Sequence, residues 1–179
     1  MEKTEITSNT ANVTFISGTG GVDFNSGAYE NFLVVINGLA ISDDDDQFRV
    51  AVSIDAGSNY NAQTYRATDE IYMTQSGSSA TADTSAQSVS GSSTLVGAGG
   101  NNSGAAHAVL LWCFDFNSTI LKKYMYAEVL EEQHNSIYKK RSSIINIAEK
   151  NSAIDGLQFG CNAGNIAKGK FRVYGINKG

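Results

Sequence analysis

The feature that most constrains this chain is a series of short segments in which apolar and polar residues alternate, separated by clusters of Gly, Asn, Ser and Asp. The clearest is residues 47–55, whose apolar side chains all fall on one face: Phe48, Val50, Val52 and Ile54. A period of two indicates a β-strand with one buried face. No segment has the length and periodicity of a crossover helix, so we expect the strands to be antiparallel.

Further strand-like segments follow at the spacing that is typical of sandwiches and barrels. They are residues 12–16, 29–37, 60–67, 70–74, 106–116, 122–130, 142–148, 154–161 and 170–176. Asn37-Gly38 should end the second of them in a turn, and residues 106–116 are apolar on both faces, which predicts a central strand. Residues 142–153 also fit a short helix, but their β-branched side chains favour a strand. We predict an all-β, antiparallel β-sandwich of about eight to ten strands.

The 179 residues suit one domain. We divide the chain into an N-terminal arm with the first strand, residues 1–21, and a sandwich domain, residues 22–179. Residues 76–104 form an insertion of Ser, Gly, Ala, Thr and Asn, with Val89, Leu95 and Val96 as its large apolar residues. Its composition is that of a flexible linker. We expect it to lie in a groove between subunits, because small residues permit close approach of backbones.

Charge excludes several classes of partner. The net charge is −5, and the only basic cluster is Lys139, Lys140 and Arg141 with Lys122 and Lys123 nearby. Nucleic acid is not expected as a partner, because binding to phosphates needs a basic face. No apolar run approaches the ~20 residues that span a bilayer. The first residues lack the pattern of a signal peptide, so we expect synthesis and retention in a cytoplasm.

The inventory of catalytic and metal-binding residues is poor. His107 and His134 have no Cys or His partner at zinc-ligand spacing. Cys113 and Cys161 lie on predicted strands and are expected to be buried free thiols. Four acidic residues are candidates for a glycosidase pair, but the sequence places no two of them at the required separation: Asp55, Glu70, Asp115 and Glu128. We predict no catalytic residue, no cofactor and no enzyme activity.

The acidic run Asp43–Asp46 invites a calcium interpretation, but it lacks the alternating carboxylates, the glycine and the final glutamate of an EF-hand loop. We expect a solvated hairpin tip, and a structural Ca²⁺ or Mg²⁺ held together with other loops is the alternative.

Aromatic residues on the predicted strands permit a carbohydrate interpretation, since tyrosine rings on an exposed sheet can stack on sugars. The candidates for glycan contact are Tyr65, Tyr72, Tyr124 and Tyr126, with Tyr60 and Trp112 as further aromatics. Packing of these rings in the core or between subunits is the commoner role.

Two stretches resemble small virion proteins of tailed bacteriophages. The first runs from Tyr29-Glu30-Asn31-Phe32 through the Asp-rich run to Phe48-Arg49-Val50-Ala51-Val52-Ser53-Ile54-Asp55-Ala56-Gly57-Ser58-Asn59-Tyr60. The second is Ser152–Phe159 followed by Ala163-Gly164-Asn165-Ile166-Ala167-Lys168-Gly169-Lys170-Phe171-Arg172-Val173-Tyr174-Gly175-Ile176. The resemblance covers roughly residues 22–66 and 105–176 and omits the Ser/Gly-rich insertion.

The resemblance implies a sandwich of jelly-roll type, a turn at Asp55–Ser58, a hairpin at Ala163–Gly169 and no active-site residue. It also implies a structural component of the virion, made in the host cytoplasm, as a capsid decoration or cement protein or in a tail or fibre. With the poor catalytic inventory, it leads us to expect a homo-oligomer, preferably a trimer, that contacts other virion proteins. The expected assembly interface comprises Tyr29, Phe32, Val34, Leu95 and Val96. The alternatives are a receptor- or glycan-binding module of a tail fibre or spike, with host glycan as partner, and a glycan-degrading enzyme.

Overall fold

The computed structural model describes residues 1–60, 63–69, 71–74, 80–82, 86–101, 106–133, 137–148 and 151–177, and these contain strands but no helix. The strands are β1 (Glu2–Ile6), β2 (Asn12–Ile16), β3 (Tyr29–Ile41), β4 (Asp46–Ser53), β5 (Thr64–Asp69), β6 (Ile71–Thr74), β7 (Ala80–Ala82), β8 (Ala86–Ser90), β9 (Ser93–Gly99), β10 (His107–Phe114), β11 (Lys123–Gln133), β12 (Ile137–Ile147), β13 (Gly156–Cys161) and β14 (Ile166–Asn177). Their ladders are antiparallel. The predicted all-β, antiparallel sandwich is confirmed, with more strands than expected.

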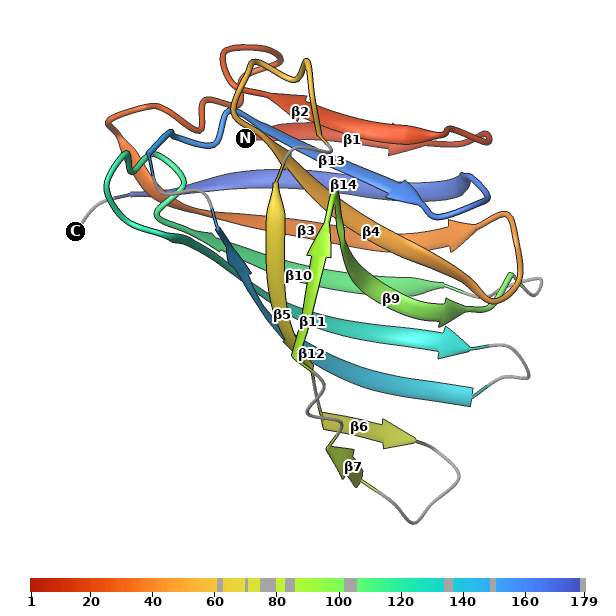
Figure 1. Cartoon of the computed structure of the whole chain (residues 1–179). Coiled ribbons are helices and arrows are strands. Elements are labelled where there is room, and N and C mark those ends of the chain that lie inside the picture. The colour runs from red at the N-terminus through yellow and green to blue at the C-terminus, as the bar shows by residue number, and fades with distance from the viewer. Residues whose placement is uncertain are drawn as a thin grey trace.

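The strands form two layers that pack face to face (Figure 1). The first layer has the order β1-β14-β3-β10-β11-β12, and the second has the order β9-β4-β13-β2. The ladder passes between the layers through one residue pair, Gln133 with Gly99. The hairpin of β5 and β8 adds to β12 and leads into β9, so it closes this side of the sandwich.

Several connections cross from one layer to the other, so strands adjacent in sequence are often not paired. This is true of β2 and β3, β3 and β4, β12 and β13, and β13 and β14. The prediction of a hairpin at Ala163–Gly169 is therefore wrong, because β13 and β14 do not pair with each other. Residues 162–165 form an arch from the second layer to the first, because β13 pairs with β2 and β4 while β14 pairs with β1 and β3.

The core lies between the layers and is rich in phenylalanine. Phe48 stacks on Phe159 with ring centroids 6.0 Å apart, and Phe171 approaches Phe159 at 5.8 Å. A second group at one end of the sandwich joins Phe24 to Phe32 at 5.0 Å. Burial of such a side chain contributes on the order of 2–3 kcal/mol, which explains why the β2, β4 and β13 patterns place their apolar face inward.

β3 does not end at Asn37-Gly38, contrary to the sequence prediction. Its pairing with β10 continues past this point, but the register shifts by one residue between Ile36 opposite Val109 and Leu39 opposite His107. Gly38 takes a φ of +62° there. The dipeptide that favours a turn therefore forms a β-bulge, because glycine tolerates left-handed backbone in either setting.

The Ser/Gly-rich insertion 76–104 is not an unstructured linker in its described part. It contributes β7, β8 and β9, and Leu95 and Val96 of β9 are fully buried. β9 pairs with β4 and so forms one edge of the second layer. The helical alternative for residues 142–153 is also wrong over 142–147, which belong to β12.

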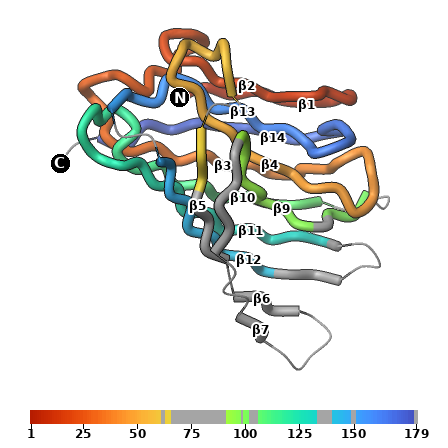
Figure 2. The backbone as a smooth tube through the Cα atoms, viewed as in Figure 1, coloured from red at the N-terminus to blue at the C-terminus, as the bar shows by residue number. Residues whose placement is uncertain are grey.

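The N-terminal strands occupy the edges of both layers, β1 beside β14 and β2 beside β13 (Figure 2). β1 carries alternating charge, and Glu5 lies 3.1 Å from the Lys170 amine. Charged edge strands discourage pairing with strands of other molecules.

Candidate functional site: the outer face of the first layer

A row of large apolar and aromatic side chains crosses the outer face of the first layer. Register places Tyr174 beside Leu33, Leu33 beside Trp112, Trp112 beside Tyr126 and Tyr126 beside Ile144, one residue from each of five strands. Their neighbours along the chain, such as Leu111 and Ala127, point inward and are fully buried. The row therefore lies on the side of the sheet away from the core.

Many of these outward side chains are open to solvent. Exposure is 40% at Leu110, 61% at Leu130, 54% at Ile144 and 43% at Tyr124. The adjoining β10–β11 loop adds Ile120 and Leu121, at 81% and 53%, and places them at the end of the sheet where β11 begins. At roughly 200 Å² per large side chain, these groups expose on the order of 600 Å² of apolar surface, the upper end for a monomeric protein.

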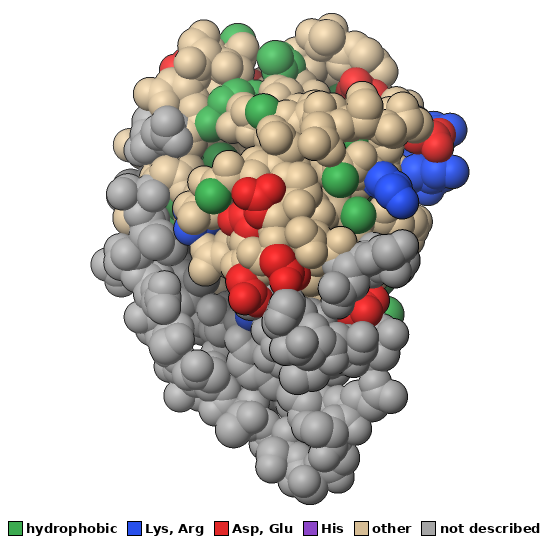
Figure 3. Space-filling view, turned by 90° about the vertical axis from the view of Figure 1, so that its right-hand side faces the viewer, with side chains coloured by type: hydrophobic (Ala, Val, Ile, Leu, Met, Phe, Trp, Pro, Cys, Tyr) green, Lys and Arg blue, Asp and Glu red, His purple; other side chains and the backbone are tan. Residues whose placement is uncertain are grey.

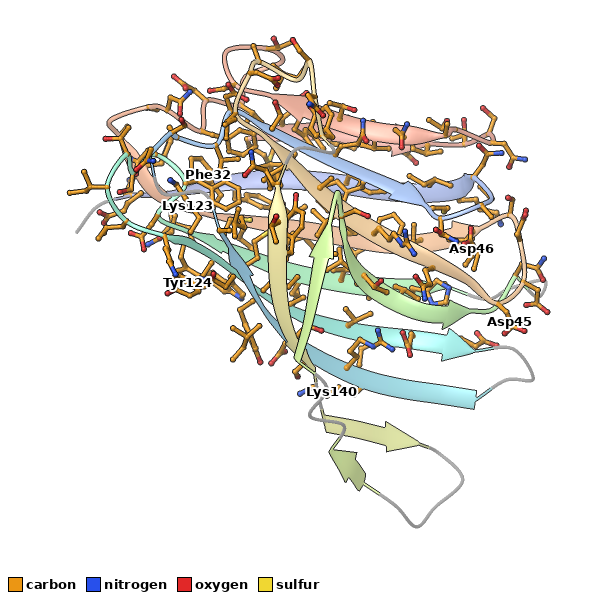
Figure 4. The ribbon with its side chains drawn as sticks, in the orientation of Figure 1. Phe32, Asp45, Asp46, Lys123, Tyr124 and Lys140 are labelled. Carbon is orange, nitrogen blue, oxygen red and sulfur yellow. The ribbon has the colours of Figure 1, made fainter. Side chains whose placement is uncertain are left out.

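The same face is hollowed where β10 and β11 meet the bulge of β3. The hollow has a volume of about 340 Å³ and is lined by Asn37, Ala108, Val109, Leu110, Glu128, Val129, Leu130 and Lys140. One ion pair lines the hollow: Lys140 Nζ lies 3.9 Å from Glu128 Oε1, and Tyr126 donates to the same oxygen at 2.9 Å. The acceptor Glu128 raises the pKa of the Tyr126 hydroxyl. Figure 4 labels Lys140, which lines this hollow, and Tyr124, which lies near the start of β11.

The residues predicted as the assembly interface lie elsewhere. Phe32, Val34, Leu95 and Val96 are buried within the chain, and Tyr29 is partly buried against Phe32 with ring centroids 6.2 Å apart. Phe32 and Val34 belong to the inner face of β3 instead. This assignment is corrected, since a fully covered side chain offers no surface to a second copy.

The predicted glycan contacts divide in the structure. Tyr65 is fully buried, and its hydroxyl accepts a hydrogen bond from the Val52 N–H at 2.7 Å. The prediction that Tyr65 is exposed for glycan contact is therefore wrong. Burial raises the pKa of this phenol. The side chain of Tyr72 lies outside the described residues. Tyr124 and Tyr126 lie on the outer face together with Trp112.

The acidic run joins the two layers. Asp46 is buried, and its carboxylate accepts hydrogen bonds from the N–H groups of Gln47 at 2.7 Å, Gly164 at 2.8 Å and Ala163 at 3.2 Å. Asp43, Asp44 and Asp45 are exposed as predicted. The expected hairpin tip is wrong in two respects, because β3 and β4 are not paired with each other and Asp46 is buried. Figure 3 shows acidic side chains gathered on this end of the molecule, and Figure 4 places Asp45 and Asp46 there.

Metal ligands do not converge in the described part of the chain, where no group of three or more His, Cys, Asp and Glu is placed to hold an ion. The predicted turn at Asp55–Ser58 is present: Ala56 has a φ of 57°, and Asp55 accepts from the Asn59 N–H at 2.9 Å. Of the other carboxylates considered for catalysis, Glu128 lies on the outer face, and Glu70 lies outside the described residues.

Ionisable groups are buried on the inner face of the first layer. Glu131 lies 3.9 Å from Arg141 and accepts from the Gly97 N–H at 3.1 Å. His107 is buried, and its Nδ1 accepts from the Glu132 N–H at 3.2 Å, so the neutral ring is the form that fits. Burial lowers the pKa of His107. Lys123, at the start of β11, is also fully buried (Figure 4). The second histidine, His134, lies outside the described residues.

Both cysteines are free thiols. Cys113 is buried as predicted, but Cys161 is only partly so. Burial raises both pKa values, that of Cys161 to about 12. Low thiol reactivity follows, because the thiolate is the nucleophile.

The sequence pattern that relates to this outer face is the apolar pattern of residues 106–116. The apolar residues on both sides of 106–116 predicted a central strand, and β10 does lie between β3 and β11, with its outer side chains only partly covered. Leu110, Leu130 and Ile144 were not identified as surface residues from the sequence.

Comparisons with family models, curated proteins and solved structures find no match to this chain. The described residues contain no helix that is long and apolar enough to cross a membrane.

Proposed function

We propose that this chain is a non-enzymatic structural subunit that assembles with copies of itself through the outer face of the first layer. The single observation that carries the proposal is the exposed apolar surface of β10, β11 and β12. A standard interface buries about 800 Å² per partner, and the exposed large side chains supply most of that area. Aromatic enrichment is typical of an interface core, and the charged residues Glu128, Lys140 and Arg172 lie around the aromatic row on the same face.

Assembly would change the energetics of this face. Leu130 and Ile144 are more than half exposed, so covering them against a partner removes apolar area from water at about 25 cal/mol per Å². The Lys140–Glu128 pair at the edge of the hollow is exposed and contributes little by itself. In this arrangement Trp112 and Tyr126, which lie side by side at the centre of the row, are the expected hot spots.

The assembly we propose is a tailed-bacteriophage virion, as a capsid decoration or cement protein or in the tail or fibre. This part rests on the sequence resemblance in residues 22–66 and 105–176 and leads us to expect a trimer. Each subunit would add buried area that exists only in the assembled particle and so stabilise it by mass action.

Light scattering after size-exclusion chromatography tests the self-association. We expect a concentration-dependent oligomer for the unmodified chain and a monomer for Leu130→Glu and Ile144→Glu, with association weakened at least ~100-fold by the buried charge. Thr14→Glu, on an exposed position of β2 in the other layer, is the matched control and should associate normally. An unmodified chain that stays monomeric at about 100 µM would contradict the proposal, because its dissociation constant for self-association would then exceed about 100 µM.

Particle association tests the virion part separately. Mass spectrometry of phage particles banded on a density gradient should find this chain in fixed proportion to the major capsid protein. A chain that self-associates but is absent from particles would leave the oligomer proposal intact and remove the virion assignment.

A receptor- or glycan-binding module is the second candidate. It is favoured by three aromatic residues that lie on the outer face of the first layer, Trp112, Tyr126 and Tyr124. Stacking of sugar rings on these aromatics would give host-cell binding that Trp112→Ala abolishes. Binding that survives in the Leu130→Glu monomer would favour this candidate over self-association.

A further inference from the structure

A small polar recess lies on the outer face of the second layer. The strands that line it, β2, β4 and β13, belong to the layer opposite the one with the apolar face (Figure 1). It has a volume of about 160 Å³ and is lined by Asn12, Arg49, Val50, Ala51, Ser92, Gln158, Gly160, Cys161 and Asn162. Register places Gly160 of β13 between Asn12 of β2 and Arg49 of β4. A Cβ on Gly160 would collide with Asn12 Oδ1, so the absence of a side chain there creates the floor of the recess.

Arg49 is held in a fixed orientation by a neutral partner. Its Nε and Nη2 both donate to Gln47 Oε1, at 3.2 and 2.6 Å, and Thr94 Oγ1 donates to the same oxygen at 3.3 Å. Two guanidinium N–H groups are used in this way, and the others have no hydrogen-bond partner among the described residues. Because Gln47 carries no charge, the positive charge of Arg49 is oriented without being neutralised.

The other polar side chains that line the recess are neutral, and the carboxylates of Asp46 and Asp43 act on Cys161 at its edge. Asn12 and Gln158 contribute carboxamides and Ser92 contributes a hydroxyl, and no carboxylate is among the described lining residues. Carboxamides and hydroxyls donate and accept, which suits the hydroxyl groups of a sugar, while guanidinium suits the planar geometry of a carboxylate. Sites for drug-sized ligands measure several hundred Å³, so this recess has room for one sugar ring or one anionic group.

We propose that this recess binds the carboxylate of an acidic monosaccharide unit, with Arg49 as the carboxylate ligand and Asn12, Gln158 and Ser92 as partners of the ring hydroxyls. A single cation surrounded by neutral amides matches a singly charged carboxylate better than a doubly charged phosphate. The site is independent of the proposed assembly, because it lies on the other layer. Monomeric Leu130→Glu should therefore bind the sugar as the unmodified chain does.

Titration of the full chain with D-glucuronate, followed by NMR chemical shifts at low salt, tests the proposal. D-glucose is the matched ligand control, since it has the same ring without the carboxylate. We expect glucuronate to bind at least tenfold more tightly than glucose, in the millimolar range typical of a single small contact set. Raising the salt concentration should weaken glucuronate binding because the contact is charged.

Substitutions locate the contact. Arg49→Met should weaken glucuronate binding at least tenfold, and Arg49→Lys should recover only part of it, because an ammonium loses the planar fork. The matched control is Arg172→Met on the outer face of the first layer, opposite Val35, which should leave binding unchanged. Far-ultraviolet circular dichroism establishes that each variant folds.

Four results would each overturn the proposal. They are equal binding of glucose and glucuronate, tighter binding of inorganic phosphate than of glucuronate, an unaffected Arg49→Met variant, and no saturable binding up to about 50 mM glucuronate. None of them bears on self-association, so the two proposals fail independently.

Discussion

The two layers of the sandwich distribute polarity in opposite ways. The second layer turns Phe15, Phe48 and Phe159 inward and Thr14, Gln47, Arg49 and Gln158 outward, as expected of a sheet with one face in water. The first layer turns Leu33, Leu110, Trp112 and Tyr126 outward and carries His107, Lys123, Glu131 and Arg141 on its inner face. Both layers bury apolar side chains between them, and the first layer adds ionisable groups to its inner face and apolar groups to an outer face that also carries Glu128, Lys140 and Arg172. The difference teaches that the second layer has the pattern of a sheet with one face in water, whereas the first layer leaves large apolar side chains exposed.

The largest expected effect separates the two layers by stability. Phe159→Ala removes a ring that stacks on Phe48 and approaches Phe15 and Phe171, and should lower the free energy of unfolding by about 3–5 kcal/mol. Leu130→Ala, at a position 61% exposed on the first layer, should change it by less than ~1 kcal/mol. Urea denaturation at a concentration where both variants are monomeric measures the two values. Equal losses would mean that the outer face of the first layer is part of the folding core.

The next effect concerns the buried Asp46 carboxylate, which connects the β3–β4 loop to the β13–β14 loop. Asp46→Ala leaves the N–H groups of Gln47, Ala163 and Gly164 without their charged acceptor and should cost about 3 kcal/mol. The control is Asp45→Asn, because Asp45 is exposed, and its φ of 59° suits asparagine. Thermal unfolding of both variants measures the difference. A stable Asp46→Ala protein would show that the arches of β3–β4 and β13–β14 do not depend on this carboxylate.

The smallest effect tests the ionisable interior of the first layer. Burial lowers the pKa of His107 in the folded state below its usual 6.5. As the pH falls through 6.5, the unfolded chain therefore binds a proton that the folded chain does not bind. The contribution of His107 is therefore complete above pH 6.5 and is lost as the pH falls below it, with a slope of at most ~1.4 kcal/mol per pH unit.

His107→Gln keeps an acceptor for the Glu132 N–H and removes the titration. Between about pH 7.5 and 5.5, the free energy of unfolding should fall by ~1 kcal/mol more in the unmodified chain than in this variant. Parallel pH profiles would place the acid sensitivity in other groups.

Much of the strand content was predictable because local alternation reports it directly. Residues 12–16, 47–55 and 170–176 fall on β2, β4 and β14, since each has one apolar face that must be covered. β9 was missed because the segment 93–99 offers Leu95 and Val96 among Ser, Thr, Gly and Ala, which is too weak a pattern to distinguish from a linker. Its place in the sheet depends on β4, more than forty residues earlier in the chain.

The candidate sites required the tertiary structure to different degrees. From the sequence we expected Tyr124, Tyr126 and Tyr65 on an exposed sheet face. Buried Tyr65 could not be separated from the other two, because tyrosine occurs both in cores and on surfaces. The Arg49 recess has no local signature, since Asn12, Arg49, Ser92 and Gln158 come together only through strand pairing.

The sequence by itself determined that this chain forms strands, because a period of two in its apolar residues fits an extended backbone, and the lack of a crossover helix indicated that they are antiparallel. Which faces those strands cover was decided by tertiary structure. A strand that is apolar on both sides, such as β10, is equally compatible with a second covering layer and with an open face. The arrangement of the partner strands determines which side of β10 receives the core, and leaves the side chains on the other side partly exposed.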